Sequence, residues 1–408
     1  MSISYLAWLG FCLFVTYGVA TALIPALIKL AREFEFYDQP DGGRKVHTVS
    51  TPTFGGVAIY FAFIIAFSLL EAMSSSGMRT YFDGYGFFVA ASMMLFLIGV
   101  RDDLSGVLPK QKLMAQVVAS ILFIAGMGIW IPTMGGLFGM ESLPWWAGMP
   151  LSLFAIIVLS NAYNLIDGID GLAGSVGVIA SLCFGAWFLY ASIWIWAAFS
   201  LLLAGSLIGF LRFNMHPARI FMGDTGSLLV GFFLSLQAIA FIHFGTTIGS
   251  GLYWQDAAPV IAMAILVIPL FDTLRVFIIR MARGQSPFSP DRSHLHHILL
   301  DMDCDHREAT FVLTTVNILF VSIALFLAQY MGPTLLFFTM LGFCFLLFPT
   351  GGWKSRLVHP WVDKKDMLSF IRFLIHPGTK ENEIRRAEGS ANVKAMPASS
   401  GSRASDAK

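Results

Sequence analysis

The chain contains the long uncharged stretch 171-GLAGSVGVIASLCFGAWFLYASIWIWAAFSLLLAGSLIGFL-211, which has no Lys, Arg, Asp or Glu. As a single helix it would be about 60 Å long, about twice the thickness of the hydrocarbon core of a bilayer. The stretch therefore predicts two consecutive membrane-spanning helices, at 171–190 and 192–211.

The rest of the chain has the same character. Of its 408 residues 56% are hydrophobic and only 12% are charged, and the mean hydropathy is +0.72. Soluble domains carry about 25% charged residues, so an ordinary soluble enzyme is excluded. The formal net charge of +1, without a basic stripe, argues against a nucleic-acid partner. The four cysteines lie far apart and form neither a disulfide framework nor a zinc ligand set.

Charged residues delimit about eleven predicted spans, and the fold class is an all-α polytopic membrane protein. The first 20 residues lack a basic region and a cleavage site, so the first helix is expected to be retained. The predicted spans are 5–31, 53–72, 84–101, 112–131, 149–165, 171–190, 192–211, 225–245, 257–281, 308–330 and 333–350.

The basic residues predict the orientation. Every Lys and Arg except Arg79 lies in or beside the connections after odd-numbered helices, or in the C-terminal tail. The positive-inside rule makes that side cytoplasmic, which places the N-terminus in the periplasm and the C-terminus in the cytoplasm. We expect a catalytic membrane domain at 1–350, a cytoplasmic tail with an amphipathic helix at 351–388, and a disordered, Ser/Ala/Gly-rich tail at 389–408.

Acids, amides and histidines gather in four of the predicted cytoplasmic connections. A polar loop residue is most often simply solvated, but four such loops on one face suggest a site. The first loop contains Asp102 and Asp103, whose mutual repulsion raises one pKa unless a cation or metal compensates it, so the pair is either a solvated loop or a site for Mg²⁺ or phosphate chemistry. Lys112 follows, at a spacing that allows it to bind a phosphate.

The second loop, NAYNLIDGIDGLAG at 161–174, gives the stronger signal. Asn164, Asp167 and Asp170 recur every third residue, so a helical turn would stack them on one side. The interspersed glycines would let a ligand approach the backbone closely. The alternative is a polar hinge with capping acids.

The third and fourth loops add further ligand types. Asn214 and Asp224 precede a predicted helix, where an acid either caps the helix or binds Mg²⁺, and where free amides favour phosphate. The fourth loop holds Arg292 with three histidines that match no zinc motif: His294, His296 and His297. This group is better suited to binding a diphosphate or a sugar.

Two classes of function fit this face. The first is a Mg²⁺-dependent membrane enzyme that acts on a phosphorylated cytosolic substrate, with a second substrate entering from the bilayer. The alternative is an ion-coupled transporter, which would place its ionisable residues near the middle of the membrane. Only Asp272 and Arg275 interrupt a predicted helix interior, so the sequence favours the enzyme.

Five motifs together resemble the polyprenyl-phosphate N-acetylhexosamine-1-phosphate transferases, and they occur in that family's order. The HLHH string favours the N-acetylglucosamine branch over the branch that makes peptidoglycan precursors. The motifs are RKVHTVSTPTFGG (44–56), RDDLSG (101–106), NAYNLIDGIDGLAG (161–174), FNMHPARIFMGDTGS (213–227) and GQSPFSPDRSHLHH (284–297).

The resemblance implies a reaction and a location. The family transfers a sugar 1-phosphate from a UDP-sugar to undecaprenyl phosphate with Mg²⁺ or Mn²⁺ as cofactor, releasing UMP, in the bacterial cytoplasmic (inner) membrane with the active site on the cytoplasmic face. The partners are then UDP-N-acetylglucosamine, undecaprenyl phosphate and membrane lipid, and the product begins a cell-surface polysaccharide such as an O-antigen. Another UDP-N-acetylhexosamine, a UDP-muramoyl-pentapeptide donor and a homodimer stay open as alternatives.

The resemblance also implies roles for single residues. Asp224 matches the Mg²⁺-binding acid, and Asn164 matches an amide beside the metal. Asp170 matches a position near uracil, on which Phe221 would stack. The other matches are Lys112 and Arg292 at the diphosphate, His294 and His296 at the sugar phosphate, His47 in the first motif, and Asp102, Asp103 and Asp167 as essential acids.

One position departs from the family pattern. Many relatives carry a third acid in the first acidic motif, where this chain has Gly106. No role of that acid can therefore apply here. Our hypothesis is a single displacement in which Asp102 or Asp103 orients or deprotonates the lipid phosphate.

Overall fold

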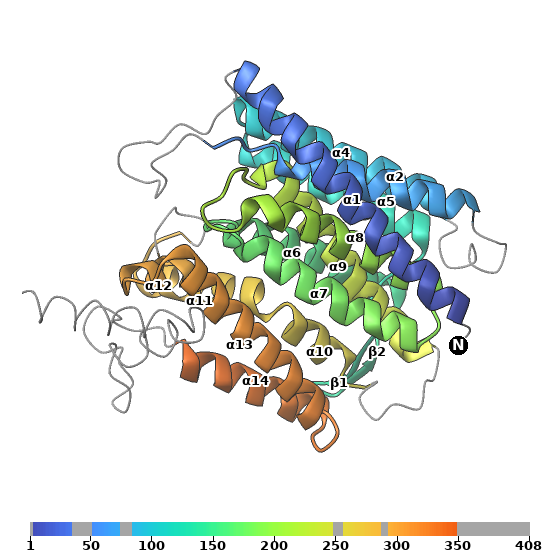
Figure 1. Cartoon of the computed structure of the whole chain (residues 1–408). Coiled ribbons are helices and arrows are strands. Elements are labelled where there is room, and N and C mark those ends of the chain that lie inside the picture. Colours follow the sequence, from blue (N-terminus) through green and yellow to red (C-terminus); the bar gives the residue numbers. More distant parts are fainter. Residues whose placement is uncertain (1–2, 35–50, 74–83, 248–255, 287–292, 349–408) are drawn as a thin grey trace, which may run out of the picture. The chain divides into compact units, whose positions relative to one another are not determined.

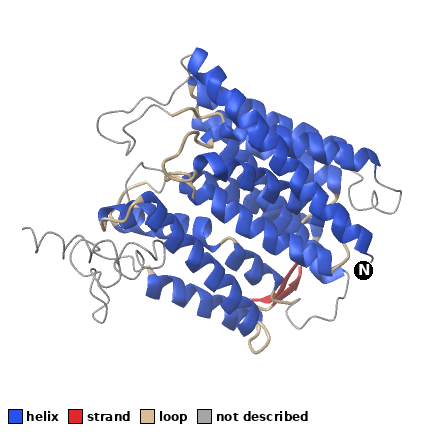
Figure 2. Ribbon diagram, viewed as in Figure 1, coloured by secondary structure: helices blue, strands red, loops and turns tan. Residues whose placement is uncertain are grey.

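The computed structural model describes residues 3–34, 51–73, 84–247, 256–286 and 293–348. Within these ranges the chain forms thirteen helices and one two-stranded hairpin, which confirms the all-α class (Figure 2). The elements are α1 (Ile3–Glu33), α2 (Gly55–Met73), α4 (Tyr85–Ser105), α5 (Pro109–Met127), β1 (Thr133–Leu137), β2 (Met140–Ser142), α6 (Trp145–Ile166), α7 (Leu172–Tyr190), α8 (Trp194–Asn214), α9 (Gly223–Thr247), α10 (Ala258–Ile265), α11 (Val267–Ala282), α12 (Leu295–Asp301), α13 (His306–Leu327) and α14 (Pro333–Leu347).

The helices make this a multi-pass membrane protein. Seven described helices are long and apolar enough to span a bilayer, or eight if α10 and α11 count as one bent span. Each of the eleven predicted spans is largely helical, although α14 has only 15 residues. The count of eleven and the orientation of the termini stay predictions. The tail at 351–408, His47 and Arg292 lie outside the described residues.

Helix α9 lies at the centre of the bundle. In its most apolar stretch 94% of the residues are buried, compared with 28% in α1. It contacts α2, α4, α6 and α7, while α8 contacts α1, α2 and α7 (Figure 1). Because α9 is enclosed by other helices, its N-terminus is a fixed point around which several loops meet.

Two glycines let the neighbouring helices approach the start of α9. A Cβ atom on Gly56, at the start of α2, would lie 2.1 Å from the backbone nitrogen of Gly226. A Cβ atom on Gly99 of α4 would lie 2.5 Å from the Cα atom of Thr225. Real Cβ atoms do not approach backbone this closely, so both crossings require glycine.

The predicted span at 257–281 is not one continuous helix, because α10 and α11 meet at an angle of 84°. Pro269 has no N–H group and cannot bond the carbonyl of Ile265, four residues earlier. The Asn317 side chain of α13 donates to that carbonyl instead, at 3.0 Å. The bend therefore directs α11 toward the loops that hold the histidines.

A short hairpin, β1–β2, lies in the predicted connection between the spans 112–131 and 149–165, where the sequence analysis predicted no strand. Its strands are antiparallel, with Leu137 opposite Met140. The ring of Phe138 at its turn contacts Phe337 and Phe338 of α14. Strands of five and three residues, rich in Gly and polar side chains, give no alternating apolar pattern that would predict them.

Candidate active site at the N-terminus of α9

Asp103, at the end of α4, binds the first turn of α9. Its Oδ1 accepts the N–H of Asp224 at 2.7 Å, and its Oδ2 accepts the N–H of Thr225 at 3.0 Å and the Thr225 hydroxyl at 2.5 Å. These contacts satisfy amides that a helix N-terminus leaves without intrahelical partners. Burial nevertheless raises the pKa of Asp103 to about 6, against the hydrogen bonds from Thr225 and Asp224 that lower it. Asp103 thus holds α4 and α9 together.

Lys112, in the first turns of α5, joins two of the predicted site acids. Its Nζ lies 2.6 Å from Oδ1 of Asp224 and 3.0 Å from Oδ2 of Asp102. The other Asp102 oxygen accepts the N–H of Val107 at 2.8 Å. The ammonium group therefore partly compensates the repulsion between acids from two different loops.

Asn164, near the end of α6, completes this centre. Its Nδ2 donates to Oδ1 of Asp224 at 2.7 Å and to Oγ of Ser227 at 2.6 Å. Four elements thus meet at Asp224, namely the end of α4 and the start of α5, the end of α6 and the start of α9. We call Asp102, Lys112, Asn164, Asp167 and Asp224 the acidic centre.

Asp167 is the acid of the acidic centre whose charged form is least favoured. Its carboxylate is half-buried and has no hydrogen-bond or ion-pair partner among the described residues. Burial raises its pKa well above the ordinary value, and the negative charges of Asp224 and Asp103 raise it further. A cation placed beside Asp167 would remove this penalty.

The prediction that a helical turn stacks Asn164, Asp167 and Asp170 on one side is wrong. Helix α6 ends at Ile166, and α7 begins only at Leu172. The turn between them directs Asp170 away, to a separate cluster with His216 and His306. Polar side chains in helix-end loops compete for backbone hydrogen bonds, so a spacing of three does not ensure helix there.

The Asp170 cluster joins three loops. Oδ2 of Asp170 lies 2.6 Å from Nδ1 of His216 and accepts the N–H of Ala218 at 3.1 Å, while Oδ1 lies 3.4 Å from Nδ1 of His306. Burial would raise the pKa of Asp170, but the hydrogen bonds to His306 and His216 outweigh burial and lower it to about 2. Oδ1 of Asp170 and the two histidine nitrogens could together hold a metal ion.

The remaining third-loop residues support this cluster. The buried Asn214 accepts the N–H of Gly171 at 2.9 Å and donates to the carbonyl of Ile220 at 2.9 Å. Its amide therefore fixes two loops to each other. Phe221 is half-buried, and its backbone pairs with Pro52 and Gly55. The predicted substrate-binding roles of Asn214 and Phe221 stay predictions.

The histidines of α12 lie beside the second loop. A Cβ atom on Gly168 would lie 2.3 Å from Nε2 of His296, so the ring packs directly against the residue after Asp167. His294 and His296 stack with centroids 5.7 Å apart, and His297 lies 4.3 Å from His296. Burial lowers the pKa of His296 to about 3, and the neighbouring His297 lowers it further. The fourth loop thus reaches the acidic centre through Gly168.

Three residues of the site were missed by the sequence reasoning. His216 lies inside the quoted motif FNMHPARIF, so its signal was present but unused. His306 lies beyond the last motif, and no spacing pointed to it. Asp272 was noted only as an interruption of a helix, although its carboxylate bonds His294 at 2.9 Å.

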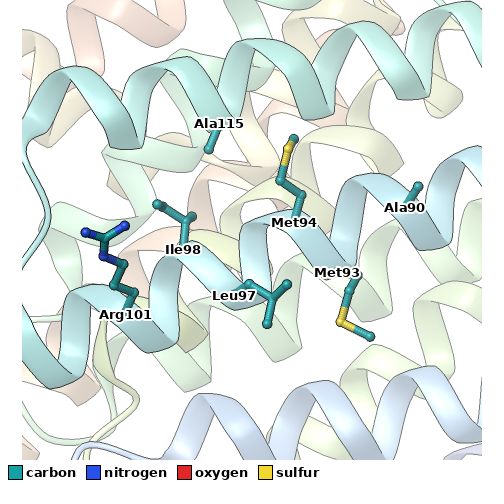
Figure 3. Close-up of a pocket in the computed structure, with 7 residues that line it drawn as sticks. All are labelled: Ala90, Met93, Met94, Leu97, Ile98, Arg101 and Ala115. Atoms are coloured by element: carbon teal, nitrogen blue, oxygen red, sulfur yellow. The ribbon is translucent and has the colours of Figure 1, made fainter.

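An apolar groove runs along α4 beside the acidic centre (Figure 3). Its volume is about 480 Å³, and Arg101, next to Asp102, lies at one end. The groove is lined by Ala90, Met93, Met94, Leu97, Ile98, Arg101 and Ala115. Its composition suits a hydrocarbon chain and not a nucleotide.

The donor chemistry of the acidic centre fits a hard divalent cation. Mg²⁺ prefers carboxylate and amide oxygens and usually keeps several waters. Asp224 and Asp102 provide carboxylates that both contact Lys112, and Ser227 and Asn164 provide neutral ligands beside Asp224. Among the described residues, the group whose ligand atoms all lie within 4.8 Å of one another is instead Asp170, His216 and His306. Burial first, and then the charges of the neighbouring acids, raise the pKa of Asp167, and a cation would oppose both effects. The residues therefore fit a divalent metal.

Comparisons with known proteins agree with this site. The glycosyl transferase family 4 model matches residues 85–242, which include Asp102, Lys112, Asn164 and Asp224. A Bacillus subtilis (strain 168) protein named "Probable undecaprenyl-phosphate N-acetylglucosaminyl 1-phosphate transferase" is 32% identical over 313 residues, covering 74% of this chain and 81% of the relative.

Two further relatives have similar names. The undecaprenyl-phosphate alpha-N-acetylglucosaminyl 1-phosphate transferase of Escherichia coli (strain K12) is 29% identical over 74% of this chain and 79% of its own length. The decaprenyl-phosphate N-acetylglucosaminephosphotransferase of Mycolicibacterium smegmatis is 32% identical over 66% of this chain and 70% of its own length.

The helical membrane bundle and the acidic centre define an integral membrane protein with a polar site at its helix ends. The chain belongs to glycosyl transferase family 4, which confirms the family resemblance found in the motifs.

Proposed function

We propose that this protein transfers N-acetylglucosamine 1-phosphate from UDP-N-acetylglucosamine to undecaprenyl phosphate. The products are undecaprenyl-diphosphate-N-acetylglucosamine and UMP. The observation that supports this most is the meeting of four loops at Asp224, where carboxylates, an ammonium group and helix amides surround one point. The names of the relatives support the choice of donor and acceptor.

The reaction is a displacement at phosphorus. An oxygen of the lipid phosphate forms a bond to the sugar-linked phosphorus of the donor. The bond from that phosphorus to the bridging oxygen breaks, and UMP leaves with the electron pair. One phosphoanhydride replaces another, so the main barrier is the approach of two anions.

The acidic centre and the basic side chains lower this barrier. We propose that Mg²⁺, with Mn²⁺ as an alternative, is held by Asp224 next to Asn164 and supplies positive charge to the diphosphate when bound. Lys112 adds an ammonium group at the same point, and Arg292 would add a guanidinium group. Asp103 keeps α9 in place, so that the acids and Lys112 stay aligned.

The geometry favours Asp167 over the other acids for contact with the lipid phosphate. Both oxygens of Asp103 bind α9, and the oxygens of Asp102 bind Val107 and Lys112. Those two carboxylates are better placed to orient groups than to remove a proton. Asp167, in the same acidic centre, has no such partner among the described residues.

The bilayer is the source of the acceptor in this proposal. The apolar groove that ends at Arg101 gives a polyprenyl chain a surface next to Asp102. The excess of Lys and Arg in the site-bearing loops supports a cytoplasmic site, where UDP-sugars are made. The Asp170 cluster is the proposed site of the uracil base, and Phe221 is proposed to stack on that ring.

The test is UMP release by the purified protein in detergent. We expect release only when UDP-N-acetylglucosamine, undecaprenyl phosphate and Mg²⁺ are all present. Asp224→Asn should lower the rate by at least 1000-fold, the order expected when an electrostatic clamp is lost. Asp256→Asn is the control, because this exposed acid lies in the connection between α9 and α10.

Other outcomes would change the proposal. Release with a different UDP-sugar only would keep the chemistry and change the donor. Flux of a solute in sealed vesicles without any need for a polyprenyl phosphate would favour the transporter. A trapped covalent sugar-phosphate enzyme would exclude the single displacement.

A further inference from the structure

Helix α11 carries three buried charged residues, Asp272, Arg275 and Arg280, and none of them belongs to the five motifs. Asp272 is 1% exposed and Arg275 is 2% exposed, within a helix that is otherwise mostly apolar where it is buried. Charged side chains inside membrane proteins are costly and usually serve a function. Their partners therefore indicate what they do.

Asp272 and Arg275 hold three consecutive residues of the histidine loop. The Asp272 carboxylate lies 2.9 Å from Nδ1 of His294 through Oδ2 and accepts the N–H of Leu295 at 2.8 Å through Oδ1. Nη1 of Arg275 donates to the carbonyl of Ser293 at 2.6 Å. The start of α12 is thus attached to α11 on both sides of His294.

The hydrogen bond to Asp272 determines which nitrogen of the His294 ring carries the proton. A carboxylate only accepts hydrogen bonds, so Nδ1 of His294 must carry the proton. In the neutral ring the lone pair then lies on Nε2, the second nitrogen. His294 is nearly buried, with 8% of its side chain exposed, so the ring has little freedom to turn.

His294 is linked to the acidic centre by contact. Its ring stacks on His296 at an angle of 10°, and His296 packs against Gly168, the residue that follows Asp167. A shift of His294 would therefore move His296 relative to the second loop. The bend between α10 and α11 places Asp272 where it can make these bonds.

We propose that Asp272 is a positioning residue that keeps the lone pair of His294 on Nε2, so that this atom accepts a hydrogen bond from a hydroxyl or amide N–H of the donor sugar. Arg275 fixes the loop backbone for the same purpose. This inference rests on the proposed function, since it names how the same site holds the sugar. It assigns no proton transfer to Asp272.

Asp272→Asn is the sharpest variant, because it keeps the shape and reverses the hydrogen bond. The amide oxygen still accepts the N–H of Leu295, while the amide nitrogen donates to Nδ1 of His294. The ring then carries its proton on Nε2 and cannot accept there. We expect kcat for UMP release to fall at least 100-fold, with the KM values of both substrates changed less than threefold.

Two further variants separate positioning from a structural role. His294→Gln should lower kcat by a similar factor, and the double variant should lose little more, because both changes remove the same interaction. Ser152→Ala is the matched control. It removes a buried hydrogen bond from the N–H of Ile131, at 2.8 Å, and Ser152 lies at the opposite end of α6 from Asn164, so the change should lower Tm but keep kcat within threefold.

The imidazole ¹⁵N chemical shifts give a readout that does not need activity. In the wild-type protein Nδ1 of His294 should be protonated and Nε2 unprotonated, and Asp272→Asn should reverse this. The ¹⁵N signals that are missing from the spectrum of His294→Gln are those of His294. If the wild type releases no UMP, the proposed function fails while the shifts still test the positioning.

Three results would overturn the inference. The first is a kcat within threefold of wild type in folded Asp272→Asn. The second is a loss of activity in Asp272→Asn that is accompanied by changes in Tm and in both KM values, as expected for a structural residue. The third is an Nε2-protonated His294 in the wild-type protein.

Discussion

Asp167 and Asp170 lie three residues apart in one loop, yet their surroundings shift their pKa values in opposite directions. Burial and the neighbouring acids raise the pKa of Asp167, whereas hydrogen bonds to two histidines lower that of Asp170 to about 2. The charged form is thus disfavoured at Asp167 and favoured at Asp170. This contrast supports the proposed cation at the acidic centre and the proposed separate role of the Asp170 cluster.

The largest expected effect comes from separating the helices that build the acidic centre. Gly99→Ala would place a Cβ atom 2.5 Å from Thr225, and overpacking of this kind should cost about 3 kcal/mol of unfolding free energy. Gly86→Ala in the same helix meets nothing within 4 Å and should be nearly neutral. Thermal unfolding in detergent measures both. Equal Tm values for the two variants would show that the packing of α4 against α9 does not depend on the close approach of Gly99 to Thr225.

The next effect tests the need for a cation. Mg²⁺ at 100 times its Kd should raise the unfolding free energy of the wild type by about 2.7 kcal/mol, because only the folded state binds it. Asp224→Asn should show no such gain, whereas Asp170→Asn should keep it. Unfolding with Mg²⁺ and with EDTA is compared for all three proteins. A full gain in Asp224→Asn would remove Asp224 from the metal site.

The third effect uses acid to break the Asp170 cluster. The pKa of Asp170 is about 2 in the folded protein and 3.8 ordinarily, so its charge stabilises the fold above about pH 4. This stability, about 2 kcal/mol, is lost as the pH falls from about 4 to about 2. Asp170→Asn should therefore be less stable than wild type at pH 6 and lose less stability in that acid window.

Asp167→Asn is the opposite case and serves as the comparison. Its raised pKa means that the charged form is unfavourable in the folded protein without a metal. The neutral amide should raise Tm at pH 7 in EDTA and abolish turnover. A lower Tm in EDTA would contradict the view that the charged form of Asp167 is disfavoured.

The smallest effect concerns the cap of α9. Thr225→Val keeps the shape of the side chain and removes the 2.5 Å hydrogen bond to Asp103, which should cost about 1 kcal/mol. Activity should fall only slightly, because two backbone amides still bind Asp103. Ser235→Ala, a hydroxyl buried deeper in α9, is the control. An activity loss above 100-fold in Thr225→Val would assign Thr225 a direct role.

The sequence predicted the helices well, because long apolar runs separated by charges have few alternatives in a membrane. It did not predict the bend at Leu266. This bend depends on a different helix, because the Asn317 side chain donates the hydrogen bond that Pro269, without an N–H group, cannot donate. It also grouped Asn164, Asp167 and Asp170, because spacing cannot show where a helix ends. Local sequence alone could not have assigned the pairing of Lys112 with Asp224.

The enclosure of α9 also determines when the site can form during synthesis. The site residues on α4, α5 and α6 leave the ribosome before α9, and until it arrives Asp103 has no helix to cap and Lys112 has no Asp224. A chain truncated before residue 223 would contain membrane helices around a missing central one. The acids would then stay unpaired at the membrane surface, where a quality-control protease could recognise the unfinished protein.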